Sequence, residues 1–257
     1  MAFPPTNGDV HTTIFLDAGH GGVDPGGVGT TEAGQTISES GVNLSIELDA
    51  MALLRARGYR VVVSRTSNTT VVRLRSGDTS DGILSLQGSH DDVAARDACA
   101  NLAKADALVG IYMDTGGTAQ NAGSVTLYDA DRPFSQANVQ LAGLLQTDVL
   151  SAMNAKGWQI PNDGSLPDTG FGSSVGDPET GGLAAEAAAY NHLLLIGPSM
   201  TGYFSTPSEM PGAVIEPLYI TDPFEGSVAV DSADQMVIAQ GIATAIEQFV
   251  HDRRAAG

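Results

Sequence analysis

The first quarter of the chain shows two different spacings of its apolar residues. The apolar run Thr13–Leu16 predicts a buried strand, which leads into a glycine-rich loop over residues 18–29. A set of apolar residues then recurs at helical spacing, and Gly58 follows it as a C-cap: Val42, Leu44, Leu48, Met51 and Leu54. Val61–Val63 predicts a second strand. The chain therefore opens with a strand, helix, strand unit.

The same alternation continues to the end of the chain. Further strands are predicted at residues 107–113, 122–128, 192–196 and 213–218. Helices are predicted around Ala95, Cys99 and Leu102, around Leu141, Leu145 and Val149, and around Ile238, Ile242, Ala245 and Phe249. Ser232, with Gln235 three residues later, predicts a capping box at the start of the last helix. No internal repeat interrupts this order.

Strands that alternate with helices favour an α/β fold. We predict a three-layer α/β/α sandwich with a central, mostly parallel (mixed) twisted sheet of about six strands, forming one domain over residues 1–257. Two polar, glycine-bearing stretches, 76–91 and 156–186, are predicted to be insertions. The second is too long for an ordinary connector, so it is either a lid over the site or a surface ornament.

The composition and charge of the chain argue against some classes of binding partner. The chain has 257 residues and a net charge of -18, which would repel the phosphates of nucleic acids and the anionic surface of membranes. No apolar run is long enough to cross a bilayer, and residues 1–8 lack the features of a signal peptide. Cys99 is the only cysteine, which excludes an intrachain disulfide and a cysteine zinc cluster, and its neighbours indicate a helix core.

The loop after the first strand carries the first candidate for chemistry. His20 lies there between glycines that allow a ligand to approach the backbone, and a neutral imidazole in such a place is a natural zinc ligand. The alternatives are a phosphate-binding loop or a plain turn. The regular GxGxxG spacing of a nucleotide-binding loop is absent, as is a GK[ST] ending.

The segment LDAGHGGVDPG, residues 16–26, resembles the opening signature of zinc-dependent N-acetylmuramoyl-L-alanine amidases. Further segments follow in the family's order. ESGVNL contains Glu39, and VVVSR ends at Arg65. The helix of Arg96, Ala100 and Asn101 comes next, and MPGAVIE ends at Glu216. The resemblance extends from Thr13 to Val250. It implies that His20 and Glu39 are zinc ligands and that Glu216 is the catalytic acid and base.

Each of these residues also has a simpler interpretation. Glu39 alone could be a carboxylate favoured by the dipole at a helix N-terminus. Glu216 ends an apolar run, where a carboxylate is costly to bury unless it is paired or functional. Arg65 and Arg96 are predicted to be structural and to hold loops or carboxylates.

The chain departs from the family at the third ligand. The family has a histidine in a serine-isoleucine-histidine-alanine strand end, whereas this chain has Gly-Ile-Tyr-Met-Asp at residues 110–114. Tyr112 could bind metal as a phenolate, and Asp114, expected on the same face of the strand, could supply an oxygen instead. The metal could also be lost. His192 is a further substitute, although a core or strand-end histidine is the more ordinary role.

The resemblance implies an enzyme that uses Zn²⁺-activated water to cleave the amide between N-acetylmuramic acid and L-alanine in peptidoglycan or a muramyl peptide. It also implies a secreted or cell-wall location. An anionic third ligand should make the zinc-bound water less acidic and the enzyme slower. Two alternatives remain open: an amidase-fold module that binds peptidoglycan or a protein partner without hydrolysis, and a metal hydrolase for another amide.

Overall fold

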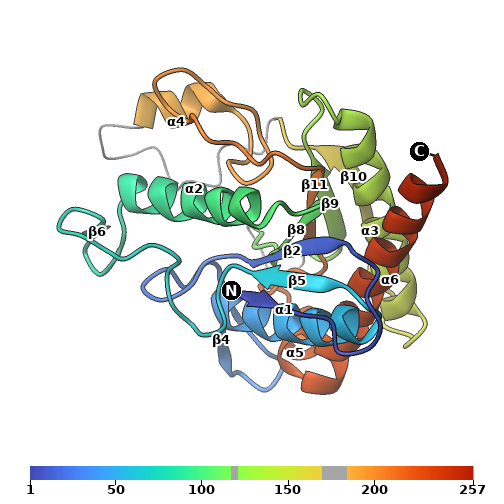
Figure 1. Cartoon of the computed structure of the whole chain (residues 1–257). Helices are drawn as coiled ribbons and strands as arrows, with labels where there is room; N and C mark the ends of the chain where they lie inside the picture. Colours follow the sequence, from blue (N-terminus) through green and yellow to red (C-terminus); the bar gives the residue numbers. More distant parts are fainter. Residues whose placement is uncertain (117–120, 170–183, 257) are drawn as a thin grey trace.

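A seven-stranded sheet forms the centre of the computed structural model, which describes residues 1–116, 121–169 and 184–256 (Figure 1). Across the sheet the strands lie in the order β1 (Ala2–Phe3), β5 (Arg60–Val63), β2 (Thr13–Ala18), β8 (Ala107–Ile111), β11 (Gly212–Glu216), β9 (Ser124–Tyr128) and β10 (Asn162–Pro167). Two small hairpins lie outside it: β3 (Val28–Thr30) with β4 (Thr36–Ser38), and β6 (Thr79–Ser80) with β7 (Ile83–Leu84).

The direction of each strand decides which loops meet. Strands β5, β2, β8 and β11 are parallel, so their carboxyl ends share one edge of the sheet. Strand β9 is antiparallel to β11, and β10 is parallel to β9. The carboxyl ends of β9 and β10 therefore lie at the opposite edge, which gives the sheet two separate sets of strand-end loops.

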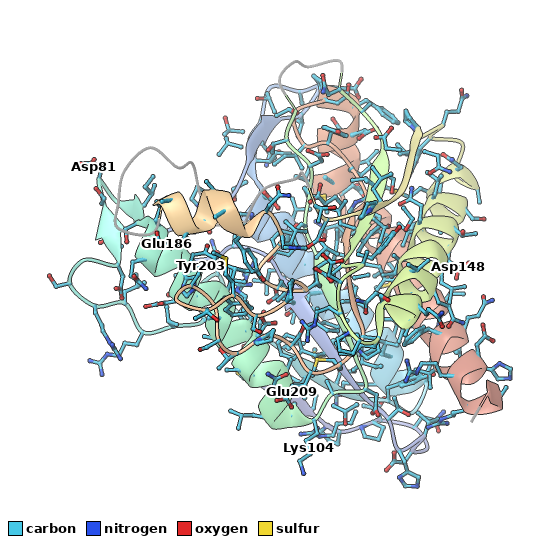
Figure 2. All side chains as sticks on the ribbon, turned by 90° about the horizontal axis from the view of Figure 1, so that it is seen from above. Asp81, Lys104, Asp148, Glu186, Tyr203 and Glu209 are labelled. Atoms are coloured by element: carbon cyan, nitrogen blue, oxygen red, sulfur yellow. The ribbon has the colours of Figure 1, made fainter. Side chains whose placement is uncertain are left out.

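Helices cover both faces of the sheet, as Figure 1 shows. One face packs against α1 (Glu39–Ala56), α3 (Ser135–Asn154), α5 (Pro223–Val230) and α6 (Ser232–Ala256). The other packs against α2 (Leu86–Ala103), α4 (Ala184–Tyr190) and the segment that follows α4. Tyr203 of that segment lies between α2 and α4, because its ring centroid is 4.9 Å from that of His90 and 5.2 Å from that of Tyr190 (Figure 2). The predicted three-layer α/β/α architecture is confirmed.

Most predicted elements are present, and four details are wrong. Residues 192–196 form a buried turn and not a strand. The last helix is capped by Asp231, whose carboxylate accepts hydrogen bonds from the N–H groups of residues 233 and 234, and not by Ser232. Leu102, predicted in a helix core beside Cys99, is 85% exposed. Strand β10 was not predicted, because its six residues NDGSLP are mostly polar and it pairs only with β9.

The structure describes the first predicted insertion throughout and the second only in part. Residues 76–91 form the hairpin β6–β7 and the first turn of α2, where the Ser85 hydroxyl accepts a hydrogen bond from the N–H of Gly88. Of 156–186, residues 170–183 lie outside the described part, so its interpretation as a lid or an ornament stays a prediction. Within the described ranges, no helix has the length and apolarity needed to span a membrane.

Candidate active site

One edge of the sheet gathers four of the five residues predicted to carry chemistry. His20 follows β2, Glu39 is the first residue of α1, Asp114 follows β8, and Glu216 is the last residue of β11. The parallel arrangement of β2, β8 and β11 brings these positions together. The site therefore lies where ligands ordinarily bind in open α/β sheets.

His20 and Glu39 face each other directly. The His20 Nε2 atom lies 3.2 Å from Glu39 Oε2, and the opposite ring nitrogen, Nδ1, lies 2.9 Å from Asp24 Oδ2. His20 has a φ of 61°, in the left-handed region, which turns its ring back toward Glu39. Gly26, with a φ of 65°, must be a glycine because a Cβ there would lie 2.6 Å from the His20 ring and 2.7 Å from the Glu39 carboxylate. A carboxylate on the remote nitrogen is the usual device that orients a metal-binding imidazole.

The two side chains form a strongly coupled pair of charges. Burial lowers the pKa of His20, but the carboxylates of Glu39 and Asp24 outweigh burial and raise that pKa to about 10. Burial raises the pKa of Glu39, but the His20 imidazolium and two backbone N–H groups hold it below its ordinary value. The site therefore favours a positive charge between His20 and Glu39, which in the absence of metal is supplied by a proton.

Backbone groups fix the Glu39 carboxylate in place. Its Oε2 atom accepts a hydrogen bond of 2.8 Å from the N–H of Gly27, and its Oε1 atom accepts bonds of 3.0 Å from the N–H of Met113 and 3.2 Å from the Asn43 amide. Asn43 is four residues further along α1, so it lies on the same side of the helix. Asn43 was not predicted as a site residue, although its spacing from Glu39 was visible in the sequence.

Glu216 and Asp114 form a second acidic pair at this edge. They are hydrogen-bonded to each other, and the Tyr219 hydroxyl donates to Asp114. Burial raises the pKa of Glu216 to about 8, helped by the charges of Asp114 and Glu39, while His20 opposes the rise. Burial also raises the pKa of Asp114. The pair therefore holds a proton at neutral pH.

The Tyr112 ring lies beside His20, with ring centroids 5.5 Å apart, but its hydroxyl is engaged elsewhere. Its hydroxyl donates to Asp17 Oδ2 at 3.3 Å, and its ring packs beside Gly19, where a Cβ would lie 2.3 Å from it. Burial, together with the charge of Asp17, raises the pKa of Tyr112 well above its ordinary value. The expectation that Tyr112 and Asp114 share a face stays a prediction, because β8 ends at Ile111 and the two side chains have different partners, Asp17 for Tyr112 and Glu216 for Asp114.

Two buried arginines hold the loop of His20, as predicted. Arg96 donates hydrogen bonds of 2.7 Å to the Ala18 carbonyl and 2.9 Å to the His20 carbonyl, and it pairs with Asp17 and Asp92. Arg65 donates to the carbonyls of Ala18 and Gly19 at 3.1 and 3.0 Å. These contacts fix the unusual backbone of the loop and therefore the direction of the His20 ring.

The donors at this edge fit a metal ion in part. The separation of His20 Nε2 and Glu39 Oε2 suits two atoms that share a zinc ion, for which bonds of about 2.0–2.2 Å in a tetrahedral site place ligand atoms roughly 3.3 Å apart. Among the described residues, no third carboxylate or imidazole brings a ligand atom within 4.8 Å of both. His192, the predicted substitute, instead lies beside Asp129 and Asp168.

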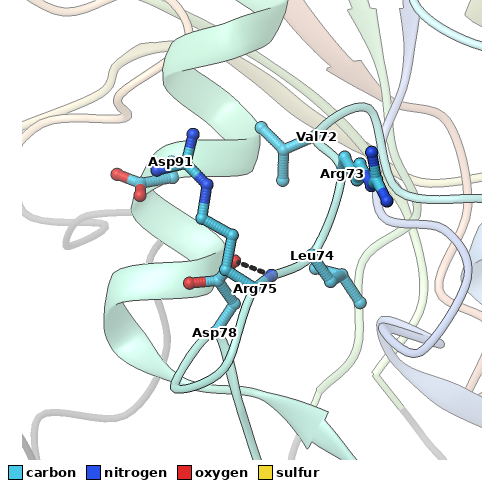
Figure 3. Close-up of a pocket in the computed structure, with 6 residues that line it drawn as sticks. All are labelled: Val72, Arg73, Leu74, Arg75, Asp78 and Asp91. Carbon is cyan, nitrogen blue, oxygen red and sulfur yellow. Dashed lines mark hydrogen bonds between the residues drawn. The ribbon is translucent and has the colours of Figure 1, made fainter.

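The insertion at 76–91 borders the site. Leu84 of β7 and Ser89 of α2 line a recess together with His20, Asp24 and Tyr112. A larger pocket of about 570 Å³ lies on the outer side of the insertion, between α2 and the loop that carries Arg73 and Arg75 (Figure 3). In Figure 3 the backbone N–H of Arg75 donates to Asp78, at 2.6 Å. These two exposed arginines stand out in a chain with only 12 lysines and arginines.

Comparisons with known proteins identify the family and the fold. The N-acetylmuramoyl-L-alanine amidase family model (Amidase_3) matches residues 14–248. The CwlD amidase of Clostridioides difficile, solved in complex with the GerS lipoprotein, is 20% identical with a TM-score of 0.66 over 94% of this chain and 99% of that one.

Two other solved amidases have the same fold. The CwlV catalytic domain of Bacillus (Paenibacillus) polymyxa var. colistinus is 21% identical, with a TM-score of 0.60 over 93% of this chain and 98% of that one. Ami1 of Mycobacterium smegmatis is 17% identical, with a TM-score of 0.61 over 96% and 100%. No curated protein sequence matches the chain. The family model covers most of the sequence, so this chain belongs to the N-acetylmuramoyl-L-alanine amidase family.

Proposed function

We propose that this chain hydrolyses the amide between N-acetylmuramic acid and L-alanine in peptidoglycan, with zinc held by His20 and Glu39 and with Glu216 as general base and acid. The observation that carries the proposal is the approach of His20 Nε2 to Glu39 Oε2 at 3.2 Å, at the sheet edge where β11 ends in Glu216. Members of this family are typically metal-dependent. The charge balance between the two side chains, which favours a cation, supports a metal there as well.

We favour Asp114 over Tyr112 as the third ligand, and its carboxylate would have to move toward the zinc, because no oxygen of Asp114 lies within 4.8 Å of both His20 Nε2 and Glu39 Oε2. A phenolate at Tyr112 would place a negative charge beside the buried Asp17 carboxylate, which its raised pKa disfavours. Asp114 is already hydrogen-bonded to Glu216, so its carboxylate belongs to the group of residues at this edge. Carboxylate oxygen is an ordinary zinc ligand.

The chain's own residues account for the proton transfers. Zinc, when bound, would polarise the amide carbonyl and lower the pKa of water. Glu216 accepts a proton from the water whose oxygen attacks the carbonyl carbon, and it then donates this proton to the L-alanine nitrogen as the C–N bond breaks. The products are a muramyl carboxylic acid and a peptide with a free amino terminus.

Arg73 and Arg75 are suited to hold the stem peptide. Their guanidinium groups lie on an exposed loop beside the insertion that borders the His20 recess. The overall charge of -18 repels anions, so the carboxylates of a peptide need local cationic partners. We propose that this loop supplies them.

The orientation of Tyr112 favours a second function, binding of peptidoglycan without hydrolysis. Among the described residues, no third carboxylate or imidazole has a ligand atom within 4.8 Å of both His20 Nε2 and Glu39 Oε2, and the Tyr112 hydroxyl is engaged with Asp17. A site with two protein ligands would hold zinc more weakly than one with three. Such a module would retain the recess and the arginine loop but would lack turnover.

Product analysis distinguishes these functions. The full chain is incubated with a muramyl peptide after treatment with a chelator, and again after zinc is returned. We expect zinc-dependent release of a peptide that begins with L-alanine, identified by mass spectrometry. Cleavage at another amide would assign a different hydrolase. Binding without cleavage in the zinc-loaded chain would favour the non-hydrolytic module.

A further inference from the structure

A second group of possible metal ligands lies at the opposite edge of the sheet. Asp129 directly follows β9 and Asp168 directly follows β10. These strands are parallel neighbours in which Tyr128 pairs with Pro167, so the two aspartates leave the sheet side by side. His192, in the turn after α4, completes the group. Among the described residues, this is the one set of three histidine, cysteine or acidic side chains with ligand atoms all within 4.8 Å of one another.

The three side chains converge on a common point. His192 Nδ1 lies 2.9 Å from Asp129 Oδ2 and 3.3 Å from Asp168 Oδ1. Ligand atoms around a tetrahedral zinc ion lie roughly 3.3 Å apart, given bonds of about 2.0–2.2 Å. The remaining oxygens point away from this centre, because Asp129 Oδ1 accepts from the N–H of Asp131 and Asp168 Oδ2 accepts from the N–H of Leu193. One oxygen of each carboxylate is therefore fixed by backbone and the other is presented inward.

The inward oxygens lack sufficient hydrogen-bond donors. Both aspartates are fully buried, yet Asp129 Oδ2 makes no hydrogen bond despite its proximity to His192. The single Nδ1 position of His192 serves Asp168 instead, at 3.3 Å. A buried carboxylate oxygen without a donor costs free energy, and native proteins normally satisfy such atoms. A cation at the centre would satisfy both oxygens at once.

This group is separate from the amidase site. In the antiparallel pairing of β11 with β9, Glu216 lies opposite Val125 and Val214 lies opposite Leu127. Continued to Asp129, this register places Asp129 level with Gly212, the first residue of β11, four strand positions from Glu216, which corresponds to roughly 13 Å along the strand. The two groups share no side chain.

We propose that Asp129, Asp168 and His192 bind a divalent transition-metal cation of the zinc type at a site distinct from the amidase centre. One imidazole and two carboxylates suit zinc better than calcium or magnesium, which prefer all-oxygen sites. His192 keeps 13% of its side chain exposed, so an ion can enter. The bound ion would tie the ends of β9 and β10 to the segment after α4.

To test the proposal, the number of bound Zn²⁺ ions is measured in variants of the full chain that lack His20, the zinc ligand proposed for the amidase site. The His20→Ala variant is treated with a chelator and titrated calorimetrically with Zn²⁺, and Co²⁺ absorption reports ligand type. We expect about one equivalent of Zn²⁺ in His20→Ala and none in His20→Ala/His192→Ala. His251 is an exposed histidine 3.3 Å from Asp252, so His20→Ala/His251→Ala is the matched control and should still bind one equivalent.

A variant whose new side chain has nearly the same size as the original one controls for misfolding. Asp129→Asn, in the same His20→Ala background, should lower the affinity for Zn²⁺ at least about tenfold and reduce the rise in melting temperature that Zn²⁺ produces. No bound Zn²⁺ in the folded His20→Ala chain would overturn the proposal, as would equal binding in the chain that also lacks His192. These readouts use no substrate, so they are independent of whether the chain cleaves muramyl peptides.

Discussion

The two edges of the central sheet differ in how completely they assemble metal ligands. At the edge formed by β2, β8 and β11, His20 and Glu39 face each other while the Tyr112 hydroxyl is hydrogen-bonded to Asp17. At the opposite edge, two aspartates and a histidine converge without help from any family motif. The difference shows that three possible metal ligands can gather without a family motif, and that the completeness of a metal site depends on which side chains converge.

The largest effect is expected from removal of the ligand at the first edge. His20→Ala should lower muramyl-peptide cleavage by about 100-fold or more, because it removes one of two approaching ligands and with it several kcal/mol of stabilisation by the metal. Initial rates at saturating zinc measure the change. His251→Ala, at an exposed site on α6, serves as the control. Retention of full activity in His20→Ala would place the chemistry elsewhere.

The next largest effect concerns the arginine behind the first edge. Arg96→Met should destabilise the fold by about 3–5 kcal/mol, because it leaves Asp17 and Asp92 buried without their cation. Denaturant unfolding measures the loss. Arg57→Met provides a contrast, since Arg57 pairs with the exposed Glu247 and should cost about 1 kcal/mol or less. An equal decrease in the free energy of unfolding in the two variants would contradict the proposed role of Arg96 in fixing the His20 loop.

A third prediction concerns a variant in which the first edge gains an additional possible metal ligand, so that it resembles the second edge more closely. Tyr112→His should raise zinc affinity about tenfold, equivalent to about 1.4 kcal/mol, by adding an imidazole next to His20. Tyr112→Phe keeps an aromatic ring, adds no ligand and serves as the matched control. Competition with a chromogenic chelator measures both. Weaker or unchanged binding in Tyr112→His would show that this position cannot contribute a ligand.

The smallest predicted effect concerns the arginine loop. Arg75→Ala should raise KM a few-fold with little change in kcat, because an exposed charge pair contributes about 1 kcal/mol at most. Arg253→Ala, at an arginine near the far end of α6, should leave both constants unchanged. A fall in kcat with constant KM would instead assign Arg75 to the chemical step.

The sequence was sufficient to predict the layers and to indicate the residues that meet at one edge of the sheet. Alternating strands and helices indicated the sandwich, and a glycine-rich loop after a buried strand marked the position of His20. Glu39 and Glu216 were predicted from the resemblance of their segments to the amidase family, and each adjoins a well-marked element, namely the start of a helix and the end of an apolar strand.

Contacts across the fold were beyond prediction. Residues 193–196 are apolar because a turn is buried there, which a hydrophobic pattern alone does not distinguish from a strand. Tyr112 turns inward because Gly19 and Gly110 leave room for its ring, a fact of packing between strands. The group at the second edge depends on the pairing of β10 with β9, and the polar sequence of β10 concealed that pairing.

The proposal of metal-dependent amide hydrolysis depends most directly on Glu216. The decisive measurement compares the rate of muramyl-peptide cleavage by the intact, zinc-loaded chain with the rate of the Glu216→Gln variant. Glu209→Gln is the control, because Glu209, labelled in Figure 2, lies beside the end of α2. We expect Glu216→Gln to be about 10²- to 10⁴-fold slower, because a carboxamide can neither accept nor return the proton, while Glu209→Gln retains its rate. Equal rates in the intact chain and in Glu216→Gln would contradict the mechanism.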